Sequence, residues 1–397
     1  MLSKDRDKEQ IGRGSLLNDA GFRAGVAQAV VLLILVGAVW FFSYNVYQNL
    51  TRAGITTGFA FLSQPAGFDV SQSLIDYSSR STYADALLVG ILNTLLVSAM
   101  GIVCSTILGF FLGVIRLSPN WLVAKLAAAY TEIIRNIPLL LQILFWYLAI
   151  LAPLPGPRLA LHFGELVYLC NRGLQVPRPL FAEEFLATAV TLFFAVLLSL
   201  LLIFWSRRHQ TRTGRRFPAY WVSLALVVVL PLATFTLTGS PLTWEIPTLS
   251  GFNFSGGITV LPELLALWLA LTLYTATFIG EYVRSGIMAV DRGQIEAARA
   301  LGHRPWMTYR LVVIPQAMRV VTPPLISQYL TLVKNSSLAV VIGYPDLVHV
   351  FAGTALNQSG QAVEIIAITM AVYLTISLLI SLLMNWYNRA VAMRGGQ

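Results

Sequence analysis

The stretch ALLVGILNTLLVSAMGIVCSTILGFFLGVI occupies residues 86–115 and contains no charged side chain in its 30 positions. A membrane-spanning helix needs about 20 consecutive, mostly apolar residues, so this stretch is long enough to cross a bilayer. The rest of the chain has the same character, because 56% of its 397 residues are hydrophobic and only 11% are charged. A water-soluble domain of this length does not show such a balance. The sequence therefore predicts an all-α polytopic membrane protein.

About eight segments are expected to span the membrane. Seven are apolar runs, at residues 24–42, 86–115, 136–154, 185–205, 219–237, 264–280 and 365–385. The eighth, residues 323–344, is interrupted by four polar side chains, Lys334, Asn335, Ser336 and Ser337. It is included because the distribution of basic residues requires it.

Basic residues indicate the orientation, since Lys and Arg beside membrane helices stay in the cytoplasm. With eight spans and both termini inside, 21 of the 27 Lys and Arg residues fall in cytoplasmic segments, five fall outside, and Lys334 lies within a span. Without the eighth span, Arg389 and Arg394 would lie outside. Membrane topology therefore explains the net charge of +9 better than nucleic-acid binding does.

The first apolar run follows a charged leader of 23 residues that contains Asp and Glu. Such a leader is not typical of a signal peptide, so we expect an uncleaved anchor helix. Cys104 falls in a span and Cys170 in an external loop, and this difference in depth argues against a disulfide. We expect no metal or cofactor site in this chain.

Six parts make up the expected organisation of the chain. They are a cytoplasmic N-terminal segment (1–23), the anchor helix and an external loop (24–84), a first helix pair (85–154), external loops with a second helix pair (155–261), three final helices with a cytoplasmic loop at 284–322 (262–388), and a cytoplasmic tail (389–397). The external loops are rich in turn residues. They either receive an external protein or serve only as connectors.

The cytoplasmic loop is the unusual segment, and with its flanks reads EYVRSGIMAVDRGQIEAARALGHRPWMTYRLVVIPQAMRVVTPP from Glu281 to Pro324. Asp291 is a good helix N-cap, and Gly302 can take the left-handed conformation that ends a helix. These two residues predict a helix of about ten residues. Pro305 suits the first turn of a second short helix, which Pro315 is expected to stop.

The first of these helices combines a charge with small and apolar residues. Ile295, Ala298, Arg299 and Gly302 share one side by helical spacing, and Ala297, Ala300 and Leu301 extend the small and apolar surface. Small residues permit close approach by another protein, and Glu296 is free to meet a basic residue of that partner. The alternative is an amphipathic helix that lies on lipid.

A resemblance favours the first interpretation. The segment EAARALGHRPWMTYRLVVIP resembles the signature loop of ABC importer permeases, in which Glu-Ala-Ala, three residues, Gly, nine residues and Ile-x-Leu-Pro recur. Glu296, Ala297, Ala298, Gly302 and Pro315 stand at the family's positions, and Val312 and Ile314 replace the usual Ile and Leu.

Other stretches are similar to the polar amino-acid branch of that family. They are GILNTLLVSA from Gly90, IIRNIPLLLQILFWY from Ile133 and PPLISQYLTLVKNSSLAVVIG from Pro323. Asn136 and Ile137 depart from the pattern, since this branch usually has Gly and Thr before the proline. The similarity covers residues 85–152 and 262–388, and implies a five-helix permease core with an extra N-terminal helix and an inserted helix pair. In length and layout the chain resembles the permeases of general L-amino-acid uptake systems.

The resemblance also implies partners. They are two ATPase subunits, a second permease that is related but different, and a periplasmic amino-acid-binding protein, assembled in the bacterial inner membrane. ATP and magnesium are expected in the ATPase subunits, because none of the four lysines of this chain follows a glycine, as a phosphate-binding loop requires. The loop at 291–315 would couple the spans to ATP hydrolysis. No nucleic acid is expected.

Lys334 is the one basic residue deep in a span, and burying it unpaired would cost a few kcal/mol. No acid of the chain is expected at its depth. It therefore either meets a substrate carboxylate or a second subunit, with Asn335, Ser336 and Gln142 as further candidates for the substrate path, or it bonds to helix carbonyls or extends toward the surface. Asn93 and Thr94 are expected to hold helices together.

Two other functional classes remain open. One is a secondary transporter driven by an ion gradient, for which intramembrane acids and repeated broken helices would be expected. The other is a membrane sensor that binds a solute-loaded receptor without transporting.

Overall fold

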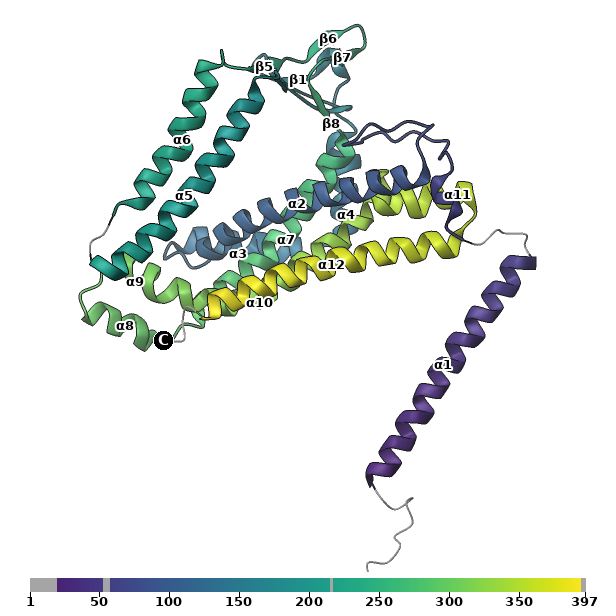
Figure 1. Ribbon diagram of the computed structural model, residues 1–397, viewed down its shortest axis with the longest axis horizontal. Coiled ribbons are helices and arrows are strands. Elements are labelled where there is room, and N and C mark those ends of the chain that lie inside the picture. The colour runs from purple at the N-terminus through teal and green to yellow at the C-terminus, as the bar shows by residue number, and fades with distance from the viewer. Residues whose placement is uncertain (1–19, 53–57, 215–216, 394–397) are drawn as a thin grey trace, which may run out of the picture.

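The computed structural model describes residues 20–52, 58–214 and 217–393, and most of them form long helices (Figure 1). Within these residues, seven helices are long and apolar enough to cross a membrane, and a bent helix pair brings the number to eight. This agrees with the predicted polytopic architecture of about eight spans.

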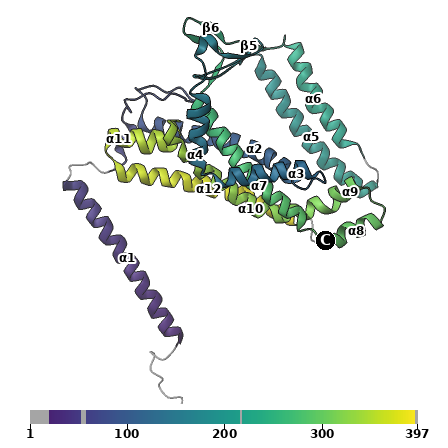
Figure 2. The same ribbon diagram turned by 180° about the vertical axis from the view of Figure 1, so that it is seen from behind.

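The anchor helix α1 (Ala20–Arg52) stands apart from the other helices (Figures 1 and 2). A short 3₁₀ turn, η2 (Ala60–Ser63), then packs against α2 (Tyr83–Ile115). The start of α2 is set by a capping box, in which Thr82 accepts from the Asp85 N–H and Asp85 accepts from the Thr82 N–H.

The predicted span at 136–154 corresponds to the second half of a bent helix pair that begins at Trp121. Helix α3 (Trp121–Asn136) is followed by α4 (Leu139–Leu144) and the π-helical segment η3 (Phe145–Leu151), with a bend of 102° between them. Pro138 causes the break, because it disfavours helical geometry at the preceding residue, and Ile137 is extended at φ −91° and ψ 126°. The Asn120 side chain starts α3 by accepting from two backbone N–H groups.

The predicted external loops between residues 155 and 261 contain eight short strands, which the turn-rich sequence did not indicate. One sheet joins β1 (Leu161–Phe163), β2 (Val167–Cys170), β3 (Gly173–Val176) and β8 (Ile258–Val260). A two-stranded pair joins β4 (Arg178–Phe181) with β5 (Leu242–Glu245) across the inserted helices, and a hairpin joins β6 (Thr248–Ser250) with β7 (Asn253–Ser255). A 3₁₀ turn, η4 (Pro157–Leu159), precedes them. Two-residue turns explain the hairpins, since Cys170 pairs with Gly173 and Ser250 with Asn253.

The inserted helix pair α5 (Phe185–Thr213) and α6 (Ala219–Leu237) forms an antiparallel hairpin that leans away from the bundle at the strand end (Figure 1). Its two helices are joined by reciprocal contacts, in which Ser199 Oγ lies 3.3 Å from the Ser223 carbonyl oxygen and Ser223 Oγ lies 3.4 Å from that of Ser199. Side-chain hydroxyls commonly hold helices together in lipid in this way.

Helix α7 (Pro262–Met288) is the most buried span and packs along α2. Glycines permit the close approach, since a β-carbon at Gly109 would lie 2.5 Å from that of Ile279, and one at Gly113 would lie 2.7 Å from the Gly280 carbonyl oxygen. This spacing of two glycines four positions apart is the small-residue pattern of membrane helix packing.

The chain then leaves the bundle as α8 (Arg292–Ala300), turns, and returns as one continuous helix. That helix comprises α9 (Pro305–Thr308), the π segment η5 (Tyr309–Val313), α10 (Ile314–Asn335) and the 3₁₀ segment η6 (Ser336–Ile342). The prediction that Pro315 stops a short second helix was wrong. The missing N–H of Pro315 is tolerated because it lies directly after η5, where the helical hydrogen-bond pattern changes.

The chain ends with the π segment η7 (Val348–Ala355), the short helix α11 (Leu356–Ser359) and the span α12 (Ala362–Met393). An apolar core at the strand end of the bundle joins η7 to η2 and α2 through Phe351, Phe61 and Tyr83.

Candidate functional site

The predicted loop helix is present as α8, and the two residues predicted to end it, Asp291 and Gly302, form its caps. Asp291 Oδ1 accepts from the Gly293 N–H at 2.8 Å. At the other end, the N–H of Gly302 donates to Arg299 O at 2.9 Å and that of His303 to Ala298 O at 3.2 Å. Gly302 has φ +79°, so these bonds form a Schellman cap. The two ends of α8 are therefore defined by local chemistry.

One face of α8 packs on the chain itself. Ile295 contacts an apolar cluster that includes Val290, Val313 and Ala317, and Ala298 is only 4% exposed. The sequence suggested that Ala298 offers a surface to another protein. The structure instead places Ala298 against the rest of this chain, where its small size lets α8 lie close to the bundle.

The remaining side chains of α8 are open to solvent. Glu296, Ala297 and Arg299 are exposed, and the two ion pairs found among the described residues involve Glu281 rather than Glu296. Leu301 is 80% exposed and Trp306 is 68% exposed. Sequence reasoning did not single out Trp306. Large apolar side chains at such exposure are typical anchors for a partner protein.

An ionic cluster connects the two spans beside α8. Glu281 of α7 pairs with Arg116 at the end of α2, and its other oxygen accepts from Arg284 Nη2 at 2.7 Å. These groups are partly buried. The cluster ties α2 to α7 near the α8 end of the bundle.

Lys334 is exposed on α10, and no ion pair involving it occurs in the described part of the chain. Ser327 and Thr331 are exposed at seven and three positions before it, on the same side of the helix. The helix ends at Ile342 and its last seven residues are 3₁₀, so Lys334 lies about 15 Å along the axis from that end. This polar stripe faces away from the chain's own core.

The residues that follow Lys334 are less accessible. Asn335 is half-buried, and Ser336 is fully buried with its hydroxyl donating to Val333 O at 2.7 Å. Of the three neighbours in sequence, only Lys334 is fully accessible.

Gln142 holds the bend after α3. It is 6% exposed, and its Nε2 donates to Ile134 O at 2.8 Å and to Ile137 O at 2.9 Å. Both hydrogens of the amide are therefore used by carbonyls that the break at Pro138 leaves without helical partners. This geometry gives Gln142 a structural role at the bend.

Asn93 and Thr94 bind the segment that follows η6, as expected of helix-packing residues. Asn93 Nδ2 donates to the carbonyls of Gln72 and Pro345, both at 2.9 Å, and Thr94 Oγ1 accepts from the Leu347 N–H at 3.0 Å.

A buried acid that sequence reasoning missed lies beside them. Asp346 is fully buried, and its Oδ1 accepts from the His349 N–H at 2.8 Å. Tyr373 of α12 lies 3.4 Å from its other oxygen. Asp346 thus caps the first turn of η7, and the Pro-Asp pair before an apolar run is the signal that could have identified it.

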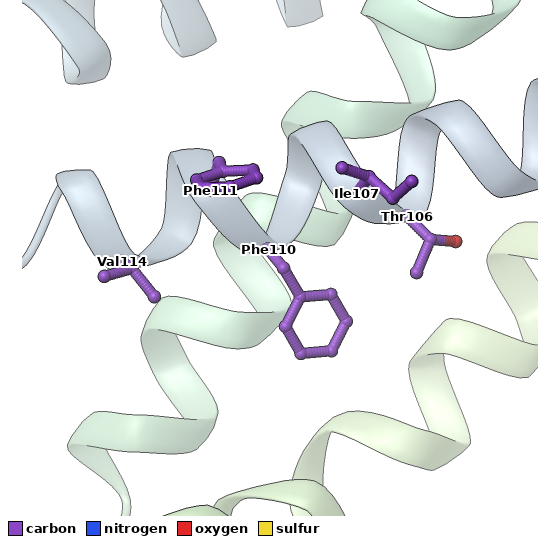
Figure 3. A pocket seen from close by; sticks show the side chains of 5 residues that line it. All are labelled: Thr106, Ile107, Phe110, Phe111 and Val114. Carbon is purple, nitrogen blue, oxygen red and sulfur yellow. The ribbon is translucent and has the colours of Figure 1, made fainter. Parts of the chain in front are cut away.

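An apolar groove lies on α2, away from these residues (Figure 3). Its lining side chains are Thr106, Ile107, Phe110, Phe111 and Val114. The Thr106 hydroxyl pairs with that of Tyr329 at 2.7 Å. The groove therefore suits an apolar chain such as that of a lipid and offers little to a charged amino acid.

Comparison with known proteins identifies the class. Residues 208–394 match the family model described as "Binding-protein-dependent transport system inner membrane component". The chain is a multi-pass membrane protein of this class, an ABC transporter permease.

Closer relatives match almost the whole chain. It is 52% identical over 370 residues to the "Putative amino-acid ABC transporter permease protein YhdX" of Escherichia coli (strain K12), covering 93% of this chain and 94% of that protein. It is 50% identical over 379 residues to the "General L-amino acid transport system permease protein AapQ" of Rhizobium johnstonii, covering 96% and 94%. The chain therefore belongs to the family of ABC transporter permeases that contains these proteins.

A solved structure titled "Crystal structure of an amino acid ABC transporter with histidines" is also similar. The TM-score is 0.46 at 20% identity, over 78% of this chain and 95% of that chain.

Proposed function

We propose that this chain is the transmembrane permease subunit of an ATP-driven importer of amino acids. The exposed surface of the loop that contains α8 and α9 carries the proposal, because Leu301 and Trp306 are large, exposed apolar side chains in the segment that matches the family's signature loop. The relatives' names supply the substrate class.

Glu296, Ala297, Leu301 and Trp306 would contact one ATPase subunit, while Gly302 ends the helix and Ala298 seats it on the permease. ATP and magnesium belong to the ATPase subunits in this scheme. Two ATPases, two permeases and a periplasmic binding protein would form the complex, with the second permease a related but different chain. The α8 end and both termini would then face the bacterial cytoplasm.

Lys334 would line the substrate path. A lysine on the outer face of a membrane helix is costly against lipid, so its exposed side favours a polar path shared with the second permease. Its ammonium suits the carboxylate that every amino acid carries, and Ser327 and Thr331 extend the polar side of the same helix.

Reconstituted vesicles test this function. Labelled amino acid should enter only when ATP, the ATPase subunits and the binding protein are present, and clamping the membrane potential should not stop it. Uptake driven by an ion gradient without ATP would indicate a secondary transporter, and binding without accumulation would indicate a sensor.

A charge reversal tests the coupling contact. Glu296→Lys should abolish uptake and substrate-stimulated ATP hydrolysis while the permease still inserts in the membrane. Gln294→Lys changes an exposed neighbour on the same helix and is the matched control. Normal transport by the Glu296 variant would remove this residue from the coupling contact.

A further inference from the structure

The end of the inserted hairpin, residues 204–221, carries an unusual concentration of positive charge. It reads FWSRRHQTRTGRRFPAYW and contains five arginines and no acid. Of these, Arg215 and Arg216 lie outside the described residues. Topology alone requires basic residues here, but it does not explain how they are arranged with aromatic side chains.

Aromatic rings in this segment contact the cationic side chains directly. The Arg208 guanidinium carbon lies 4.6 Å from the centre of the Phe204 ring. The His209 ring stacks on Trp205 at 5.0 Å and 17°, and Trp205 meets Phe217 edge-on at 5.8 Å. The Arg208 side chain is thus held beside an aromatic ring at the end of an apolar helix, the position at which headgroups surround a membrane span.

The charge is not neutralised within the described chain. Both ion pairs found there involve Glu281, so neither Arg208 nor Arg212 has a carboxylate partner in that part of the chain. Both are exposed, and the aromatic residues Trp205 and Trp221 are 51% and 75% exposed.

The hairpin is also accessible to lipid. Large apolar side chains such as Leu200, Leu201 and Trp221 are more than half exposed, whereas the serines that join α5 to α6 are buried between the two helices. Arginines just beyond such a surface meet phospholipid headgroups before they meet a soluble protein.

We propose that Arg208 and Arg212 form a binding site for anionic phospholipid together with the aromatic residues beside them, Phe204, Trp205, Phe217 and Trp221. In this site the two arginines bind the headgroup phosphate and the aromatic rings lie among the upper acyl chains. Arginine suits this ligand because its planar guanidinium pairs two N–H groups with phosphate oxygens. The site depends on membrane embedding and does not require the proposed transport activity.

Photolabelling of the full-length permease tests the site. The protein is placed in phosphatidylcholine vesicles that contain a trace of photoactivatable phosphatidylglycerol, or of phosphatidylcholine with the same reactive tail. Labelled peptides are then mapped by mass spectrometry. We expect residues 204–221 to take up the anionic probe about tenfold more than the zwitterionic one, and added salt to reduce this preference.

Substitutions show whether the arginines are responsible. Arg208→Gln with Arg212→Gln should remove most of the preference, and the corresponding double lysine variant should retain much of it. Arg80→Gln with Arg172→Gln removes the same charge from exposed positions in other loops and should have no effect. Equal labelling of α12 by either probe in every variant shows that the bundle is intact.

Three results would overturn the proposal. They are equal labelling of residues 204–221 by both probes, a preference that is insensitive to salt, and a preference that the double glutamine variant retains. If the double glutamine variant keeps the lipid preference and also loses copurifying ATPase, the two arginines bind a protein partner and the lipid assignment is wrong.

Discussion

The left-handed conformation of Gly302 allows an effect of backbone geometry to be distinguished from an effect of side-chain size. Gly302 has φ +79°, and a β-carbon built there meets no atom within 4 Å. A larger residue would therefore fit, and any defect must come from the backbone or from the surface that the partner contacts. Gly302→Val and Gly302→Asn differ mainly in how readily they adopt this conformation, since Asn tolerates it and a β-branched residue does not.

The size of the effect follows from the conformational cost. A left-handed L-residue costs about 1–2 kcal/mol, with Val at the upper end and Asn below it. About 2 kcal/mol changes an equilibrium roughly thirtyfold. Helix α8 has only nine residues, and so short a helix is marginal without its caps. The loss should therefore appear as fraying of α8 and not as unfolding of the spans.

The assay compares three proteins in vesicles with their ATPase subunits. Gly302→Val should lower substrate-stimulated ATP hydrolysis and uptake by about tenfold or more, while Gly302→Asn should keep a substantial part of both. Equal amounts of permease in the membrane and equal thermal stability show that the bundle is intact. Wild-type coupling by the valine variant, or an asparagine variant as defective as valine, would refute the role assigned to the backbone.

Three further predictions concern the bundle. Lys334→Met should raise the half-saturation concentration for uptake, and an unchanged value for every amino acid would exclude Lys334 from the path. Gly113→Leu should lower the thermal stability of the purified permease, because its side chain would overlap the α7 backbone, whereas Gly37→Leu has open space and should have little effect. Glu281→Gln should destabilise the protein by about 1–2 kcal/mol, because it leaves partly buried arginines without a carboxylate. If Glu281 and Arg116 are coupled, the double variant with Arg116→Gln should lose less stability than the sum of the losses in the two single variants.

The features that were predictable from sequence are those that depend on short-range chemistry. Hydropathy identified the spans because the bilayer sets a minimum apolar length. Asp291 and Gly302 identified the ends of α8 because caps satisfy backbone groups within the same turn. Pro305 lies at the start of α9, as its fixed φ predicts.

Other features depend on contacts between distant residues and could not be deduced in this way. The four-stranded sheet pairs β3 with β8, which are more than 80 residues apart, so neither loop alone indicates it. Ala298 was correctly placed in α8, but which side of α8 faces the bundle is decided by Val290, Val313 and Ala317. The sequence alone makes Gln142 a candidate for the substrate path, because its role at the bend becomes visible only when α3 and α4 are placed together.

The continuous helix from Pro305 to Ile342 joins the two candidate sites physically. Lys334 follows Pro305 by 29 residues, which is about 45 Å along a helix axis. The proposed ATPase contact at Trp306 therefore belongs to the same helix as the proposed substrate contact. Movement of α8 would be transmitted to this helix through the apolar cluster around Val313. The close contact of α2 with α7 at Gly113 would limit how far these two spans can move relative to each other. Coupling in such an arrangement requires rigid packing along one helix rather than a separate chain of polar contacts.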